Sequence, residues 1–419
     1  MRFVDSLPRP DFSAERGARD EFLVPLTAEG SDVAYFAGNS LGLQPRAVGT
    51  ILQTELDDWA SMAVEGHFEA QTPWASYHHD AARLAGQLVG SSADESVMMN
   101  GLTTNLHLLM ASFFRPASKR RKILMEGGAF PSDRYAVESH LRWHGMDPAA
   151  ALLLVYPDPV TGLVEEADVE ALLDRHQDEV ALVLLGGVQF RTGQRLDIPR
   201  LTRAGQAAGA MVGWDLAHAA GNVPLQLHDW GVDFAAWCSY KYLNCGPGAT
   251  AGAFVHERHH HWTGARLEGW WGVRDDVRFR MDDTFVPAAG AHAWQLSNVP
   301  VLSTAPWLVS GHLFASIGSK ALWERTCHLT SVLLSGLDSL GGSVKILTPR
   351  ESERRGSQIS IAVERDAREL ARELRARGVV CDARPPSILR FAPTAMYNTE
   401  TDIQCAIEAL AAVLHCARS

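Results

Sequence analysis

The sequence is poor in cysteine, and its cysteines lack the spacing of a metal site. The six stand at positions Cys238, Cys245, Cys327, Cys381, Cys405 and Cys416, with no Cys-x-x-Cys pair among them. In a chain of 419 residues this pattern predicts buried, reduced thiols and therefore a cytoplasmic protein. It also argues against a structural metal.

An excess of basic charge and long hydrophobic runs are missing as well. The chain has 38 Lys and Arg against 49 Asp and Glu, a net charge of −11, which argues against a nucleic-acid partner. The longest apolar runs, near 149–156 and 180–188, fall far short of the roughly 18 residues that span a membrane. Residues 1–21 lack an apolar stretch, so we expect no signal peptide.

What the sequence does contain is an alternation of apolar strands and helical patterns. Strand, helix and strand at this spacing predict an α/β fold with a largely parallel central sheet. Strands are expected at 97–99, 122–125, 152–156, 181–185, 211–215, 234–238 and 253–255. One long helical stretch from 297 to about 340 should lead into a small α+β domain, whose last helix has one apolar face.

One lysine stands at the end of a short apolar strand. Lys241 lies between Tyr240 and Tyr242, and a loop of small residues, 246–252, follows. Aromatic neighbours and close-packed backbone favour a partly desolvated, nucleophilic amine. A solvated lysine in a turn is the alternative for this residue taken alone.

Other reactive side chains should meet Lys241 at the carboxyl edge of the sheet, where ligands bind in such folds. Asp215 ends the preceding strand, followed by His218, and Phe130 lies in a loop after another strand. Thr103 begins a helix, which indicates an anion site or an ordinary helix cap. A lysine, a carboxylate, an aromatic ring and an anion site are the parts that pyridoxal phosphate needs.

The motifs that carry these residues resemble the kynureninase family, fold-type-I hydrolases that use pyridoxal 5′-phosphate. The similar segments are 35–45, 102–103, 105–110, 130–133, 215–219, 228–235 and 237–244. The resemblance implies a large cofactor-binding domain at 46–300. Residues 1–45 would pack with a small C-terminal domain, which with its linker helix covers 301–419.

The resemblance also implies a role for each matching residue. Lys241 would form the Schiff base and move the Cα proton, with Tyr240 as a possible proton relay. The remaining cofactor contacts would be Leu102 (through its backbone N–H), Thr103, Ser132 and Tyr240 at the phosphate, Phe130 stacked on the ring, Asp215 at the pyridine nitrogen, and His218 and Asp133 beside it. Trp270 and Asn298 would reach the cofactor from the second subunit of a homodimer. Substrate would meet Arg390, His67, Trp271, Ser297, Asn298 and Asn39.

The implied reaction is hydrolysis of L-kynurenine, or a ring-substituted relative, to an anthranilate and L-alanine. It would serve tryptophan degradation, supply of NAD precursors, or secondary metabolism. His67, Ser297 and Asn298 match a polar set in animal-like members, which predicts a preference for 3-hydroxykynurenine. Trp271 would wall the aryl pocket or pack in the core, and a ring-methylated substrate remains open.

Three alternatives and one departure from the family accompany this interpretation. Another fold-type-I enzyme, a cysteine desulfurase or an aminotransferase, would share the lysine, but no catalytic cysteine loop is evident. His256, Glu257 and His260 fit a zinc-protease pattern, although they directly follow a strand. A non-catalytic scaffold is the third alternative. Gly186 stands where many relatives have a serine, so one hydroxyl contact near the cofactor should be missing.

Overall fold

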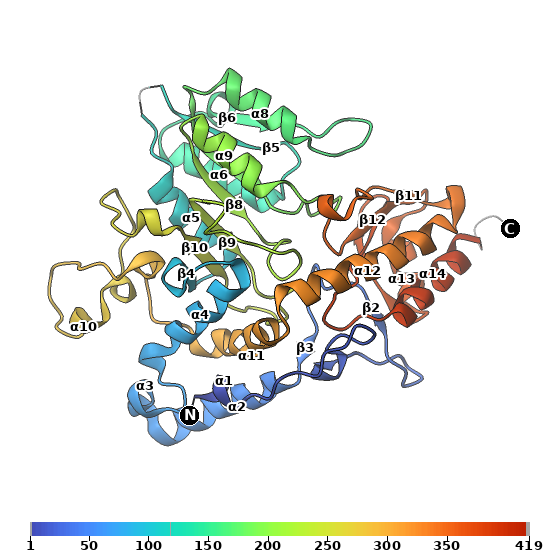
Figure 1. Cartoon of the computed structure of the whole chain (residues 1–419), viewed down its shortest axis with the longest axis horizontal. Helices are drawn as coiled ribbons and strands as arrows, with labels where there is room; N and C mark the ends of the chain where they lie inside the picture. Colours follow the sequence, from blue (N-terminus) through green and yellow to red (C-terminus); the bar gives the residue numbers. More distant parts are fainter. Residues whose placement is uncertain (1, 118, 416–419) are drawn as a thin grey trace.

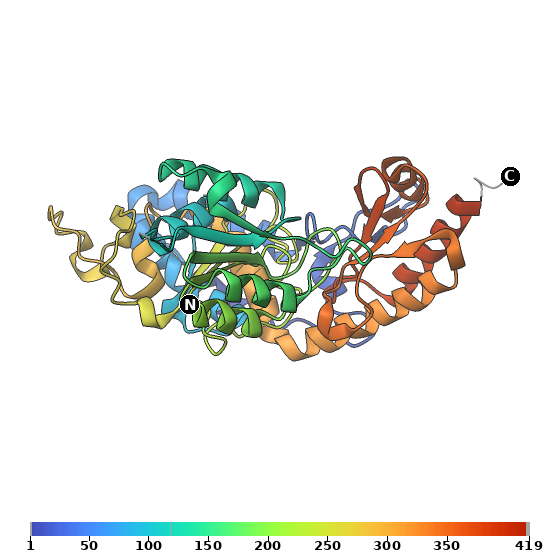
Figure 2. The ribbon, with the colours of Figure 1, turned by 90° about the horizontal axis from the view of Figure 1, so that it is seen from above.

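The structure, a computed structural model, has a large lobe and a small lobe (Figures 1 and 2). It describes residues 2–117 and 119–415, so Cys416 lies outside the described part. The five described cysteines form no disulfide. Within the same residues, no helix has both the length and the apolar character needed to cross a membrane.

The large lobe is built on a seven-stranded sheet. Its order is β4 (Ser96–Met98), β10 (Gly252–Val255), β9 (Phe234–Trp237), β8 (Met211–Asp215), β7 (Val180–Gly186), β5 (Lys122–Glu126) and β6 (Leu152–Val155). The five strands from β9 to β6 pair in parallel, and β10 runs antiparallel to both of its neighbours. The predicted largely parallel sheet is therefore confirmed.

Helices cover both faces of this sheet, which Figure 2 shows between two helical layers. They are α4 (Tyr77–Val89), α5 (Leu102–Phe113), α6 (Pro131–Trp143), α8 (Glu166–Arg175), α9 (Ile198–Ala207) and α11 (Val301–Ile317). Alternate residues of β7 enter opposite cores: Val183 and Leu185 pack on one face, Leu182 and Leu184 on the other. Burial on both faces explains why the strands read as continuous apolar runs.

The small lobe is an α+β unit. Its antiparallel sheet has the order β11 (Lys345–Ile346), β12 (Ile359–Ala362), β15 (Ile388–Phe391) and β14 (Asp382–Arg384), and it is accompanied by α12 (Ser319–Asp338), α13 (Ala367–Arg375) and α14 (Glu400–His415). The N-terminal strand β2 (Ala34–Tyr35) pairs in parallel with β13 (Val379–Val380). The domain limits at 45 and 300 stay a prediction.

The expected single linker helix is wrong in one respect. Gly318 has a φ of +87° and separates α11 from α12. Glycine adopts this conformation without the penalty that a Cβ carries, so the chain turns there instead of continuing as one helix. The remaining elements are α1 (Phe3–Ser6), α2 (Ala47–Met62), α3 (Gly66–Glu69), α7 (Pro148–Ala151), α10 (Asp275–Arg278), β1 (Phe22–Leu23) and β3 (Gln44–Pro45).

The N-terminal loop at Gly42 packs directly on the backbone of the lysine loop. The Gly42 N–H donates to the carbonyl oxygen of Tyr240 at 2.9 Å. A Cβ at Gly42 would lie 2.4 Å from the carbonyl oxygen of Lys241, well inside van der Waals contact. Only glycine allows this approach, so the N-terminal loop supports the backbone of the loop that carries Lys241.

Candidate active site

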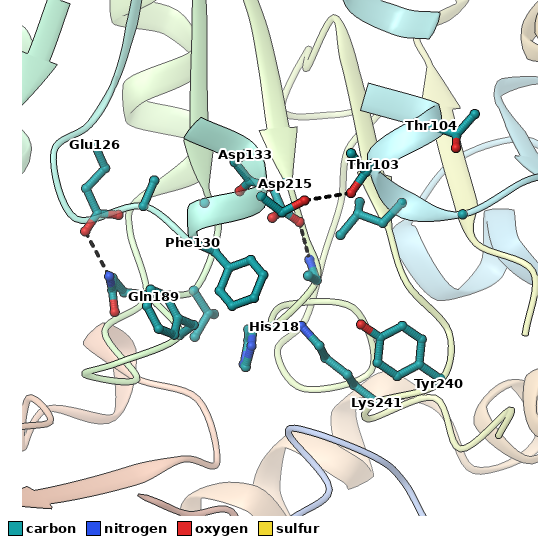
Figure 3. Close-up of a pocket in the computed structure, with 18 residues that line it drawn as sticks. Thr103, Thr104, Glu126, Phe130, Asp133, Gln189, Asp215, His218, Tyr240 and Lys241 are labelled. Atoms are coloured by element: carbon teal, nitrogen blue, oxygen red, sulfur yellow. Dashed lines mark hydrogen bonds between the residues drawn. The ribbon is translucent and has the colours of Figure 1, made fainter. Parts of the chain in front are cut away.

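A cavity of about 310 Å³ opens at the carboxyl ends of the parallel strands (Figure 3). Nine of the predicted cofactor residues line it: Leu102, Thr103, Phe130, Ser132, Asp133, Asp215, His218, Tyr240 and Lys241. They come from β8, α5, α6 and the loops after β5, β8 and β9. The fold therefore brings together side chains that are up to about 140 positions apart in sequence, as expected for a site at this edge of an α/β sheet.

Lys241 follows β9 and extends its amine into the cavity. Its Nζ lies 5.9 Å from the ring centroid of Phe130 and 5.9 Å from that of Tyr240. Among the residues that the structure describes, this Nζ forms no salt bridge and no hydrogen bond. An amine between two aromatic faces, with no partner to neutralise it, is available to a carbonyl ligand.

Two helix N-termini form an anion site opposite Lys241. The α5 N-cap is Gly101, not a threonine, and the Thr103 hydroxyl instead lies 2.9 Å from the Ser132 hydroxyl at the start of α6. Neither hydroxyl caps its own helix. Both remain free to meet a ligand beside the unpaired N–H groups of the two helices, an arrangement that favours phosphate.

Two carboxyl groups, Asp215 and Asp133, share the inner end of the cavity. Asp215 Oδ1 accepts a hydrogen bond from the Ala217 N–H at 2.7 Å. Burial, and then the adjacent Asp215 carboxylate, raise the pKa of Asp133 well above its usual range. The Asp133 carboxyl therefore retains its proton beside Asp215.

Two further titratable groups of the cavity, His218 and Tyr240, are held neutral. Burial, then the positive charges of Lys241 and Arg390, lower the pKa of His218 well below its usual range. Its Nδ1 is buried without a hydrogen-bond partner in the described structure. Burial also raises the pKa of Tyr240. A neutral imidazole and a protonated phenol can each donate a hydrogen bond to a ligand.

The sequence reasoning missed Glu126, the last residue of β5. Glu126 lines the cavity and is 5% exposed, and burial raises its pKa to about 7. The Gln189 Nε2 donates to Glu126 Oε1 at 3.0 Å and to the Gly128 carbonyl oxygen at 2.9 Å. Its place at the end of a parallel strand, directly before the Phe130 loop, was the signal that could have revealed it.

Arg390 lies behind one wall of the cavity, with its guanidinium fully occupied. Its Nη1 donates to the carbonyl oxygen of Phe190 at 2.6 Å, and Phe190 lines the cavity. Its Nη2 and Nε lie 2.8 and 3.1 Å from the two carboxylate oxygens of Asp382. Asn39 is also buried, and its Nδ2 donates a hydrogen bond to Gln358 Oε1 at 2.7 Å.

The other predicted residues do not line the cavity of this protomer. His67 lies in α3, with Nδ1 3.0 Å from the Val64 carbonyl oxygen. Trp271 is buried under the Arg278 guanidinium, 4.3 Å from the ring centroid. Trp270, Ser297 and Asn298 are exposed. A single chain leaves all of these outside the cavity, so their predicted contacts require a second subunit or a rearrangement.

The zinc-protease pattern does not form a metal site. The segment Glu257–His259 is a 3-10 helix, not the α-helix that the motif needs. His256 Nδ1 accepts from the Arg258 N–H at 3.1 Å, and its Nε2 lies 3.2 Å from the His228 carbonyl oxygen. Both ring nitrogens are already engaged with backbone groups, which rules out this interpretation.

Comparison with known proteins gives the family. The model of the kynureninase C-terminal domain matches residues 322–410, and that of class-V aminotransferases matches 34–259. Kynureninase from Salinispora tropica is 49% identical over 409 residues, covering 96% of this chain and 95% of its own. This chain belongs to the kynureninase family. Kynureninase from Stenotrophomonas maltophilia is 47% identical, with 94% of each chain covered.

The fold extends beyond the kynureninase family. The apo cysteine desulfurase of Thermococcus onnurineus superposes with a TM-score of 0.76 at 17% identity, covering 94% of this chain and 96% of its own. A cysteine desulfurase of Escherichia coli gives 0.76 at 16%, covering 95% and 98%. These likenesses show the shared fold alone. Near the lysine, Cys238 and Cys245 are buried, and burial raises the pKa of both thiols, which is the opposite of what a cysteine nucleophile needs.

Proposed function

We propose that this kynureninase-family protein binds pyridoxal phosphate in the cavity and hydrolyses L-kynurenine, preferentially 3-hydroxy-L-kynurenine, to the anthranilate and L-alanine. The observation that carries the proposal is the set of nine family-matched residues around one cavity, in a chain 49% identical to a kynureninase over nearly its full length. We further propose a cytoplasmic homodimer with shared active sites.

The donor set of the cavity fits this cofactor. Lys241 supplies the amine, the Thr103 and Ser132 hydroxyls lie 2.9 Å apart at two helix starts, and Asp215 supplies a buried carboxyl group. The unpartnered Nδ1 of His218 gives a further hydrogen-bonding group. When bound, pyridoxal phosphate links the substrate amine covalently and accepts the electron pairs released at Cα and Cβ.

The chain's own residues would then divide the proton transfers. Lys241 would be the base that removes the Cα proton of the substrate. Tyr240 is protonated because burial raises its pKa. Once water has added to the Cγ carbonyl, so that Cγ leaves as the anthranilate carboxylate, the phenol could deliver a proton near Cβ as the Cβ–Cγ bond breaks. Asp133 retains its own proton because burial raises its pKa, which would leave the Asp215 carboxyl to pair with the pyridine nitrogen.

Substrate binding would depend on the small lobe and the second subunit. Arg390 is suited to clamp the α-carboxylate, because a guanidinium binds carboxylates through two parallel hydrogen bonds. His67, Ser297 and Asn298 are polar and retain exposed surface, which supports hydrogen bonding to a ring hydroxyl across a subunit interface. A pocket built for such a bond discriminates strongly against a substrate that lacks it.

The experiment is product analysis with the purified holoenzyme. Kynurenine and 3-hydroxykynurenine are supplied separately, and alanine and the matching anthranilate are quantified over time. We expect both products in equal amounts and a higher kcat/KM for 3-hydroxykynurenine. Lys241→Ala should abolish turnover and remove the visible absorbance of the lysine-bound cofactor. Absence of alanine overturns the hydrolysis, and a clear preference for plain kynurenine overturns only the substrate preference.

A further inference from the structure

A second polar cluster lies away from the cofactor cavity, where α10 meets the first turn of α4. His78 and His79 begin α4, Asp275 begins α10, and His292 faces them from the segment before α11. They line a cavity of about 280 Å³ together with Asp94. Figure 1 shows α10 on the side of the large lobe that is remote from the small lobe. None of these residues has a role in the proposed reaction.

The geometry of three of these side chains is close to that of a metal site. His79 Nε2 lies 2.9 Å from Asp275 Oδ2, and His78 Nε2 lies 3.9 Å from Asp275 Oδ1. One ligand atom from each residue lies within 4.8 Å of the other two. Bonds of about 2.0–2.2 Å to zinc place neighbouring ligand atoms about 3–3.5 Å apart. Small side-chain rotations would therefore close the site.

His78 is the observation that points to a ligand. Its side chain is 3% exposed, yet Nδ1 has no hydrogen-bond partner among the described residues, and 3.9 Å is too long for a hydrogen bond from Nε2. Leaving buried polar atoms unpaired costs about 1–3 kcal/mol each.

The neighbouring cations do not block the site. Arg278 Nη2 contacts Asp275 Oδ1 and lies over the Trp271 ring, but a carboxylate has about four acceptor positions, so others remain open. Arg274 is engaged with Asp276, with Nη2 2.9 Å from Asp276 Oδ2. That pairing removes Asp276 from the ligand set and leaves Asp275 as the carboxylate nearest the two histidines.

We propose that His78, His79 and Asp275 bind a divalent transition-metal ion such as zinc. Two imidazoles and one carboxylate are ligands that zinc and cobalt accept, with water completing the coordination. Because Arg278 Nη2 also donates to the Trp271 carbonyl oxygen at 3.2 Å, a bound ion would hold α10 and the Trp270–Trp271 segment in place.

A second histidine cluster, formed by Glu95, His228 and His256, differs from the first in its hydrogen bonding. Glu95 has its oxygens 2.9 and 3.0 Å from His228 Nδ1 and also accepts backbone N–H groups of Ser92 and Glu257. His256 has both ring nitrogens engaged with backbone. The Glu95 oxygens, His228 Nδ1 and both His256 ring nitrogens thus have hydrogen-bond partners, so hydrogen bonding accounts for this cluster and it carries no metal proposal.

The test is metal binding to the purified holoenzyme after treatment with a chelator. Equilibrium dialysis against zinc should load one ion per chain, and cobalt should give the visible spectrum of a site with nitrogen and oxygen ligands. His79→Asn and Asp275→Asn should each weaken binding at least 100-fold. Both side chains are about half exposed, 48% and 50%, so the fold should tolerate the changes. Zinc should raise the thermal midpoint of the wild type and not of these variants.

Asp276→Asn is the matched control, since it removes a carboxylate from the same short helix without touching the ligand set. It should bind zinc like the wild type. No binding to the wild type, undiminished binding to both ligand variants, or equal loss in Asp276→Asn would each overturn the proposal. If zinc binding is lost in His228→Asn and persists in His79→Asn, the metal lies at the Glu95 cluster. That result would also overturn the proposal. None of these outcomes depends on turnover.

Discussion

Arg390 and Asp382 form a two-point ion pair behind the wall of the cofactor cavity. Arg390 Nη2 and Nε lie 2.8 and 3.1 Å from Asp382 Oδ2 and Oδ1, and the arginine side chain is fully buried. The Asp382 carboxylate thus occupies the fork of the guanidinium in the way that a substrate α-carboxylate would. If Arg390 clamps the substrate α-carboxylate as proposed, substrate must share this fork with Asp382 or displace Asp382.

The first prediction concerns this fork. Arg390→Lys keeps the positive charge and loses the planar pair of donors, at a cost of about 1.5–3 kcal/mol for a charged hydrogen bond. We expect KM to rise by about 10- to 100-fold, with a smaller change in kcat. Steady-state kinetics with the preferred substrate measure both constants.

Arg384→Lys is the control for the fork, because Arg384 also contacts Asp382, with Nε 3.1 Å from Oδ1, but is 37% exposed. Its kinetic constants should stay close to those of the wild type. A KM that is unchanged in Arg390→Lys, or raised equally in Arg384→Lys, would remove Arg390 from the role of carboxylate clamp.

Glu126 makes a pH-dependent contribution to stability. Its pKa is raised from 4.5 in the unfolded chain to about 7 in the folded protein, so the folded state binds the proton more tightly. The resulting stabilisation is fully present below pH 4.5 and is lost as the pH rises through 7. Its size is about 3 kcal/mol.

Glu126→Gln should remove this dependence. The variant should gain stability relative to the wild type as the pH is raised from 5 to 8, because it no longer buries a charge. Thermal midpoints at both pH values measure the difference, and Glu69→Gln, at an exposed position, is the control. If the difference between variant and wild type is the same at pH 5 and pH 8, the buried-acid interpretation is wrong.

Gly186 and Gly187, at the end of β7, are expected to differ in how well they tolerate substitution by alanine. A Cβ at Gly187 would lie 2.8 Å from Leu216 Cδ2 and 3.2 Å from Ala219 Cβ, whereas at Gly186 the nearest atom is 3.9 Å away. Gly187→Ala should therefore destabilise the protein by about 1–3 kcal/mol through overpacking. Gly186→Ala should be within about 0.5 kcal/mol of the wild type.

Gly186 also lines the cavity, so a hydroxyl placed there can meet the cofactor. Gly186→Ser should lower the dissociation constant for pyridoxal phosphate, measured by titrating apoenzyme and following the visible absorbance. Gly186→Ala separates the hydroxyl from the mere presence of a side chain. Equal affinity in the serine and alanine variants would show that the missing family hydroxyl has no part in binding.

Subunit mixing tests whether the active site is shared. If Asn298 and Trp270 act on the partner's cofactor, a mixed dimer of Lys241→Ala and Asn298→Ala contains one site with both residues intact. Mixing the two inactive or weakened proteins should then restore part of the wild-type activity. Mixing Lys241→Ala with Asp215→Asn should restore none, because each site keeps one defect. No gain in the first mixture would place Asn298 outside a shared site.

The central sheet and the core of the site could be read from the sequence because local patterns determine them. Continuous apolar runs bounded by glycine predict buried parallel strands, and the carboxyl ends of such strands meet at one edge. Lys241, Asp215 and Phe130 each follow or end a strand, so their meeting required only the topology. The family motifs then supplied the chemistry, which no single one of these residues specifies.

What the sequence could not provide were relationships that depend on three-dimensional packing. Glu126 becomes an unusual acid only because folding buries it at the end of β5, and Asp382 reaches Arg390 only across two paired strands. The break at Gly318 depends on a backbone angle, and His78 loses its hydrogen-bond partners only where α4 and α10 meet. The sequence pattern determined which strand or loop carries each side chain. Burial and neighbouring charges decided the protonation states and partners of these side chains, because both arise only in the folded chain.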